Sequence, residues 1–158
     1  MRKWNYLCAM LLAVLLLSAC APVAPTEQPL SLDFRGTNLT VGMPASDAIA
    51  ALGDDFTLSE SESCAGKGMD QMYTYPSLRL YVFAPAKGTA TVSSVSYTDD
   101  GARTAEGLHI GSAATDVTVA LGEPDEASDA RLCYRRGGSV LTFTLRDGRV
   151  SGIVLSGE

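Results

Sequence analysis

The sequence of 158 residues has few of the side chains that commonly serve as catalytic bases or metal ligands, with one histidine and four cysteines. It contains none of the G-x-S-x-G, H-E-x-x-H or glycine-rich phosphate-loop patterns that mark common hydrolases, zinc proteases and nucleotide-binding proteins. His109 has no second ligand near it in the sequence, whereas structural zinc usually needs four ligands in close pairs. We therefore expect a protein that is not an enzyme and that holds no cofactor and no metal.

Basic residues are scarce: 12 lysines and arginines stand against 18 aspartates and glutamates, for a formal net charge of −6. Recognition of nucleic acid depends on lysines and arginines that neutralise phosphates. The composition therefore argues against a nucleic-acid partner. The acidic excess is uneven, because residues 33–100 carry nine acidic and four basic side chains while residues 101–158 carry eight and six.

A long hydrophobic run is also missing, since the apolar stretch at residues 7–17 has only eleven residues. A helix that crosses a bilayer takes roughly 20 residues, but a shorter run after Arg2 and Lys3 is typical of a signal peptide. The run ends in "LSAC" at residues 17–20, which is a lipobox. We expect residues 1–19 to be a lipoprotein signal peptide and Cys20 to be the lipidated first residue of the mature chain. The alternative is an ordinary signal peptide with a chance cysteine.

The next segment, residues 20–37, is expected to be the lipidated cysteine followed by a proline-rich tether. It begins "CAPVAPTEQP", in which proline favours extended backbone and a semi-rigid spacer. The chain would then be held by its N-terminal lipid on the extracytoplasmic face of the cell membrane. Two acyl chains give stable anchoring, whereas one gives only marginal binding.

After removal of the signal peptide and lipidation of Cys20, only Cys64 and Cys133 remain. In an oxidising compartment an isolated pair of cysteines predicts a disulfide. A bridge across this separation would stabilise the fold by about 4 kcal/mol in the chain-entropy model. The alternative is two free buried thiols.

Two stretches of thirteen residues are similar, "VGMPASDAIAALG" at residues 41–53 and "IGSAATDVTVALG" at residues 110–122, and we call them the two copies of the repeated phrase. Each copy has a glycine before a helical pattern, an acid in the first turn and a glycine at the end, the signals that start and stop a short helix. Apolar residues at i, i+3 and i+4 give each helix one narrow apolar face. The repetition predicts two related units.

Sequence typical of β-strands follows each helix, at residues 69–75, 78–84 and 90–97, and again at 131–135, 140–146 and 149–155. Asp147-Gly148 predicts a tight hairpin between the last two predicted strands, residues 140–146 and 149–155. The expected fold class is α+β, with two tandem helix-plus-antiparallel-meander repeats, residues 38–100 and 101–158, packed as one domain. The two units either share a core or join their sheets edge to edge.

Several stretches carry a family resemblance: "LGEP" at residues 121–124, the tyrosine-bearing strand that follows it, and "DGRV" at residues 147–150. With the preceding glycine and helix, they resemble small lipoproteins of the SmpA/OmlA (BamE) type. Two such units in tandem look like the β-lactamase-inhibitor-protein-like architecture, and "SESESCAGKGMDQMYTYPSLRLYVF" resembles uncharacterised clostridial lipoproteins. The resemblance implies protein binding at the cell envelope. Outer-membrane assembly lipoproteins lack a second unit, so its presence here puts a role in the assembly of outer-membrane barrels in doubt.

Candidate partner-binding residues come from the aromatic and basic positions of the predicted strands. Tyr73 and Tyr75 are two apart and share one face of a strand, and Tyr81 shares a face with Phe83. Tyrosine is enriched at interfaces, although one of these pairs could equally belong to the core. Arginines crowd the second set of strands and either form a patch for an acidic partner or are simply solvated. The candidates are Tyr73, Tyr75, Tyr81, Arg135 and Arg136.

The predicted function is that of a membrane-anchored, non-catalytic protein-binding or scaffold module whose partner is an unknown envelope or extracellular protein. The alternative is an inhibitor of an extracellular enzyme such as a hydrolase. That alternative depends on fold analogy, and a shared fold says little about function.

Overall fold

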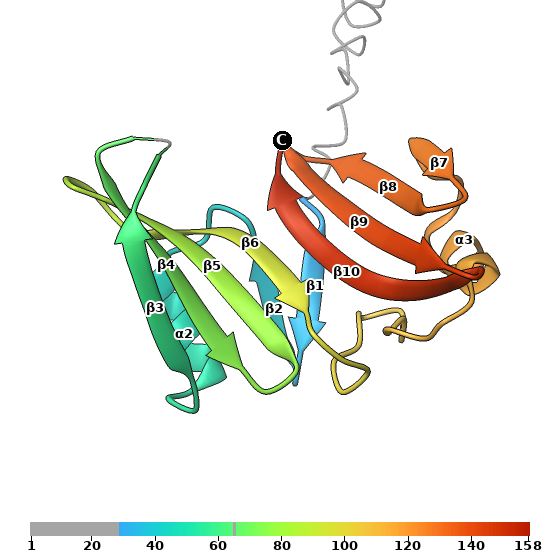
Figure 1. Cartoon of the computed structure of the whole chain (residues 1–158), viewed down its shortest axis with the longest axis horizontal. Helices are drawn as coiled ribbons and strands as arrows, with labels where there is room; N and C mark the ends of the chain where they lie inside the picture. The colour runs from blue at the N-terminus through green and yellow to red at the C-terminus, as the bar shows by residue number, and fades with distance from the viewer. Residues whose placement is uncertain (1–28, 65) are drawn as a thin grey trace, which may run out of the picture.

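A computed structural model describes residues 29–64 and 66–158 (Figure 1). The predicted signal peptide, Cys20 and most of the predicted tether lie outside the described residues. Within the described part, no helix is long and apolar enough to cross a membrane.

Ten strands and two helices make up the described chain. The first half contains β1 (Ser31–Phe34), β2 (Thr37–Thr40), α2 (Ala45–Leu52), β3 (Thr57–Glu62), β4 (Gly68–Tyr75), β5 (Leu78–Pro85) and β6 (Thr91–Tyr97). The second half contains α3 (Ala114–Leu121), β7 (Glu126–Ser128), β8 (Arg131–Arg136), β9 (Ser139–Arg146) and β10 (Arg149–Gly157). Strand β1 lies within residues 20–37, the predicted tether. It forms part of the fold because Leu32 and Phe34 alternate with polar neighbours and are buried.

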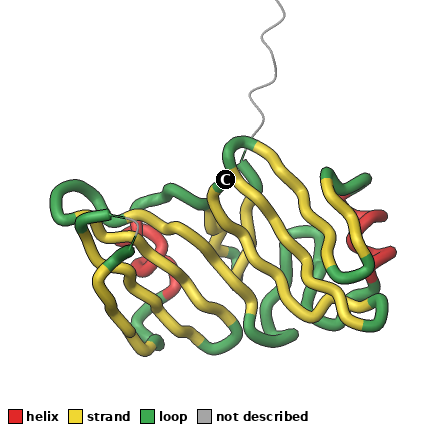
Figure 2. The backbone as a smooth tube through the Cα atoms, turned by 45° about the horizontal axis from the view of Figure 1, so that its top comes forward, coloured by secondary structure: helices red, strands yellow, loops and turns green. Residues whose placement is uncertain are grey.

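Eight of the strands form one antiparallel sheet, and β1 and β2 form a separate hairpin. The order in the large sheet is β3-β4-β5-β6-β10-β9-β8-β7, so that the last strand of each half meets the other at the centre. This seam pairs Ile153 with Tyr97 and Leu155 with Val95. Figure 1 shows the hairpin and both helices behind one face of the sheet, and the turned view in Figure 2 agrees.

The expected α+β fold class is wrong. Of the described residues, 50% are in strands and 12% in helices, and the architecture is a mostly β fold built on one large antiparallel sheet. The physical reason is that each helix has only eight residues and buries only one or two of them, so the core is made chiefly by strand residues. In place of the predicted pair of packed helix-plus-meander repeats, the strands of both halves form one continuous sheet.

The period of two in the strands decides which residues form the core. One row across the sheet joins Tyr73, Leu80, Val95, Leu155, Leu141 and Tyr134, each directly opposite the next. All six are buried, as are Ala48 of α2, Val117 of α3 and Leu32 and Leu39 of the hairpin. Burying this face removes apolar side chains from water, the main favourable term in folding.

The repeated phrase adopts the same local structure in both places. Gly42 and Gly111 have φ of +82° and +103°, values that strain other residues, and both reverse the chain before a helix. The Gly42 N–H donates to Val92 O and the Gly111 N–H donates to Val150 O. Each turn is thereby fixed to the last strand of its own half.

Candidate binding surface

The second face of the sheet is hollowed into a groove of about 700 Å³ that spans the first half and the seam. We call it the open-face groove. It is lined by Ser59, Ser61, Asp70, Gln71, Met72, Tyr81, Val82, Ser93, Ser94, Ser96 and Val154. These residues come from β3, β4, β5, β6 and β10, five strands that are neighbours in the sheet.

The strand register explains why these side chains meet. Met72 lies opposite Tyr81, and Tyr81 lies opposite Ser94, which makes one row on the face that the helices leave uncovered. The pairing of β5 with β6 shifts between Tyr81 and Val82, which leaves Ser93 as an extra residue in β6. Such a bulge bends the strand and increases its twist. Small serine side chains at and beside the bend leave the space that forms the groove.

The groove combines serine hydroxyl groups with a partly apolar floor. Met72, Tyr81 and Val154 are half-buried, whereas Ser59, Ser61 and Asp70 are exposed around them. Asp70 is the only ionisable carboxylate that lines the groove. Among the described residues there is no group of three histidine, cysteine or acidic side chains placed to hold a metal ion.

Two of the three candidate tyrosines lie on the covered face. Tyr73 and Tyr75 are buried and pack against Phe56, with ring centroids 5.0 Å and 5.4 Å from it. Burial raises the pKa of both phenols, that of Tyr75 to about 12. An exposed row of these two tyrosines is therefore contradicted, and their role is in the core. Tyr81 points the other way and lines the groove.

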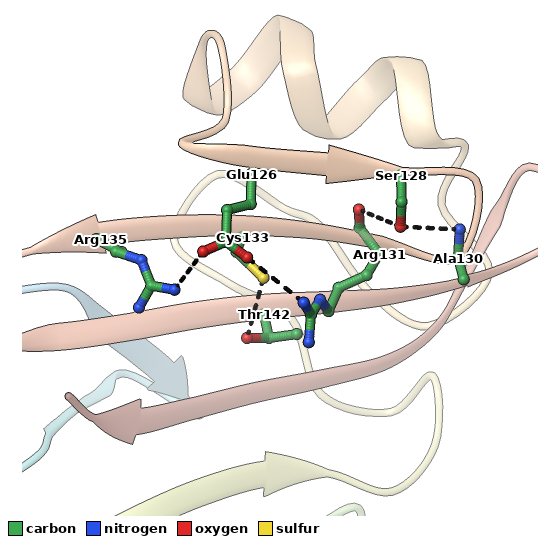
Figure 3. A network of polar contacts seen from close by, with 7 residues as sticks. All are labelled: Glu126, Ser128, Ala130, Arg131, Cys133, Arg135 and Thr142. Atoms are coloured by element: carbon green, nitrogen blue, oxygen red, sulfur yellow. Dashed lines mark hydrogen bonds and ion pairs between the residues drawn. The ribbon is translucent and has the colours of Figure 1, made fainter.

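The candidate arginines lie at the far end of the sheet, on β8. The Arg135 guanidinium contacts Glu126 of β7 with Nη2 2.6 Å from Oε1, and Arg131 contacts the same carboxylate at 3.4 Å (Figure 3). The hydrogen bond and charge of Arg135 hold the pKa of the Glu126 carboxyl below its ordinary value. Arg136 is exposed at the end of the strand. Arg135 is thus already paired within the chain, and the arginines do not adjoin the groove.

The two cysteines of the predicted bridge are far apart. Cys64 is an exposed free thiol in the turn between β3 and β4, and Cys133 is a buried free thiol in β8, 3.7 Å from Thr142 Oγ1 (Figure 3). Five strand steps separate β4 from β8, roughly 24 Å at ordinary strand spacing, whereas a disulfide needs Cα atoms within about 7 Å. This geometry contradicts the predicted disulfide. The two halves join at β6 and β10, whereas Cys64 precedes β4 and Cys133 lies in β8, so the seam does not bring the two cysteines together.

His109 contacts Ser112, with Nδ1 2.7 Å from Oγ, in the turn that leads into α3. Ser112 Oγ also accepts the backbone N–H of His109, and the serine is 8% exposed. The Ser112 N–H also donates to His109 O at 3.1 Å, so these contacts together close a four-residue turn over residues 109–112. His109 immediately precedes the second copy of the phrase, and Thr40 stands in the corresponding position before the first copy.

The residues that sequence reasoning missed are the serines and the half-buried floor of the groove. A signal for them was present in "TVSSVSY", where Ser94 and Ser96 alternate with the buried Val95 and Tyr97. The polar half of an alternating strand is usually assigned to solvent and passed over. The candidate surface is therefore the open-face groove, with Tyr81 the one predicted residue in it. No family model, curated protein or solved structure matches this chain.

Proposed function

We propose that the chain is a membrane-anchored, non-catalytic binding module that grips a protein partner with the open-face groove. The observation that carries the proposal is the groove itself: half-buried Met72, Tyr81 and Val154 form a floor, and exposed serines form its rim. An apolar centre with a polar border is the ordinary anatomy of a protein-protein interface.

The composition of the groove supports a protein ligand. Tyrosine supplies a large contact area at low entropic cost, and serine supplies adaptable hydrogen bonds, which is the combination that antibody binding loops use. Five of the lining residues are serines and one is a tyrosine. The groove extends over five neighbouring strands, which suits an extended protein surface.

The proposed anchoring follows from the lipobox at residues 17–20 and the proline-rich segment after it. Lipidation at Cys20 would hold the sheet within reach of envelope or extracellular proteins. The short tether would keep the partner close to the membrane without fixing its orientation.

Site-specific photocrosslinking tests the proposal in membranes that carry the full chain. A photoreactive phenylalanine analogue at Ser94, in the groove, is expected to give one predominant protein adduct. Val119 of α3, which is 86% exposed, provides the matched control position on another surface. The adduct from position 94 should fall about tenfold when Tyr81→Ala is added, because interface aromatics often contribute more than 1.4 kcal/mol.

Equal adducts from positions 94 and 119, or an adduct unaffected by Tyr81→Ala, would contradict a binding role for the groove. The identity of the partner separates the two functional alternatives. A structural envelope protein supports the scaffold role, and a secreted hydrolase whose activity falls on binding supports the inhibitor role.

A further inference from the structure

Strand β3 leaves one long edge of the sheet open. It has six residues, all exposed, and within the described chain it pairs only with β4. The strand at the other end of the sheet, β7, has three residues. An open edge presents unpaired backbone N–H and C=O groups to which another extended chain can add.

The register identifies which backbone groups point outward. The Ser63 N–H donates to Gly68 O, so this pair is of the hydrogen-bonded type, and the type alternates along an antiparallel ladder. Ser61 and Ser59 therefore direct their backbone groups toward β4. Leu58 and Glu60 direct theirs away from the sheet, as does Glu62.

The side chains of these outward residues carry a specific pattern. Leu58 is 45% exposed, and Glu60 and Glu62 are both exposed on the same side of the strand. Gln71 Nε2 donates to Glu60 Oε1 at 2.7 Å, but among the described residues no cation pairs with either glutamate. At the opposite edge the carboxylate of Glu126 is held by two arginines. The charge of the β3 edge is thus left uncompensated.

We propose that the β3 edge docks an extended basic segment of a partner protein, which adds to the sheet as a further antiparallel strand. Opposite residues in such a pair lie about 5.5 Å apart, and opposite charges there are stabilising. The segment then needs a basic residue opposite Glu62, a second basic residue opposite Glu60 and an apolar residue opposite Leu58. Its pattern, from its N-terminus, is basic-x-basic-x-apolar. This proposal is independent of the open-face groove, because it uses backbone groups at the edge of the sheet.

A second copy of the chain is a poorer occupant of the same edge. Full antiparallel pairing of two β3 strands over residues 58–62 centres on Glu60 and sets the two Glu60 carboxylates directly opposite one another. Like charges in that position are destabilising. The formal net charge of −6 adds a general repulsion between copies.

Amide hydrogen exchange of the full chain, measured residue by residue with a synthetic peptide, tests the proposal. The probe is acetyl-Thr-Arg-Thr-Arg-Thr-Val-Thr-amide, which carries the required pattern. At saturation we expect exchange of the Leu58, Glu60 and Glu62 amides to slow by about tenfold or more, since each gains a partner. The amides of Ser59 and Ser61 already bond to β4 and should not change.

Two peptide controls separate strand addition from simple charge attraction. A peptide with an N-methyl group on the arginine opposite Glu60 keeps its charge but loses a ladder hydrogen bond, and it should not protect the edge. A peptide with glutamate in place of both arginines should bind the wild type more weakly. Equal protection by the N-methylated peptide, or protection without alternation, would overturn the proposal.

The protein variant Glu60→Lys/Glu62→Lys should reverse the preference, so that the acidic peptide protects the edge. Glu123→Lys/Asp129→Lys makes the same change of charge at exposed positions elsewhere and should keep the preference for the arginine peptide. The alternating pattern of slowed amide exchange could also arise without any peptide and depend on protein concentration. That result would show that a second copy occupies the edge, and it would refute the proposed basic partner. No protection by the arginine peptide would refute it as well.

Discussion

Two buried tyrosines on one row of the sheet differ in the hydrogen bonding of their hydroxyl groups, and that difference predicts opposite effects of the same substitution. Tyr75 and Tyr97 both lie directly opposite Leu78, on the strands to either side of it, and both are 4% exposed. The Tyr97 hydroxyl donates to Asp33 O and lies 2.8 Å from Arg103 O. The Tyr75 hydroxyl is buried and has no hydrogen-bond partner among the described residues.

Replacing each tyrosine by phenylalanine keeps the ring and removes only the hydroxyl. Tyr97→Phe removes the hydroxyl that donates to Asp33 O, and an unsatisfied buried acceptor costs about 1–3 kcal/mol. Tyr75→Phe removes a hydroxyl whose burial without a partner costs about 1–3 kcal/mol in protein mutational data. We therefore expect Tyr97→Phe to lower the free energy of unfolding by roughly 2 kcal/mol and Tyr75→Phe to raise it by roughly 1 kcal/mol.

Urea unfolding of the full chain, followed by circular dichroism, measures both changes. With a slope of about 1–3 kcal/mol per molar urea, the two midpoints should differ by roughly 1 M or more. Tyr81→Phe, in the half-exposed groove, is the control and should change the free energy of unfolding by less than about 0.5 kcal/mol. Equal destabilisation by the two core variants would refute the reasoning, because it would mean that the Tyr75 hydroxyl also has a partner in the folded chain.

Four further predictions concern pH, the thiols, the two halves and the anchor. Burial raises the pKa of Tyr75 from 10.0 to about 12, so stability present below pH 10 should be lost as pH rises toward 12, and titration of Tyr75→Phe should show a smaller loss. In the folded chain a maleimide should label Cys64 quickly and Cys133 only after unfolding, whereas a bridge would leave neither reactive. The chain should unfold in one transition and its halves, cut within residues 98–106, should not fold alone, because the seam buries residues from both; two independent transitions would contradict this. Cys20→Ala should abolish acyl labelling and release the protein from membranes, and unchanged fractionation of an unacylated wild type would exclude the lipid anchor.

The helices and inner strands could be predicted from the sequence because their local signals are strong. Glycines at both ends of the repeated phrase predicted the helices, found at Ala45–Leu52 and Ala114–Leu121. The expected strand at residues 78–84 is found at Leu78–Pro85, and the one at 149–155 at Arg149–Gly157. Alternation of apolar and polar residues marks each of these strands, so their type and the face that each side chain takes could be predicted.

The edge strands and the joining of the sheet were not accessible in the same way. β3 reads "TLSESE" and is exposed at every position, so it has no alternating pattern to detect. Its structure depends on backbone pairing with β4, which sequence periodicity does not report. The β1–β2 hairpin was not predicted either. β1 lies in residues 20–37, which the prolines marked as a tether, and β2 crosses from this segment into the first predicted repeat. The choice between a shared core and edge pairing depends on contacts between residues about sixty apart, such as Val95 with Leu155.

The candidate site lies on the side of the sheet where the sequence is least constrained by folding. Positions such as Val95 and Leu155 must be apolar because the helices and hairpin cover them. On the opposite face Val154 could be any residue that tolerates a strand, and Ser94 contributes one hydrogen bond to the fold, from Oγ to Leu155 O at 2.9 Å. A simple need for solubility would fill that face with charges. The groove has instead five serines, a tyrosine, a methionine and only one carboxylate. Folding and solubility therefore explain little of the composition of this face, which supports the proposal that the groove binds a partner.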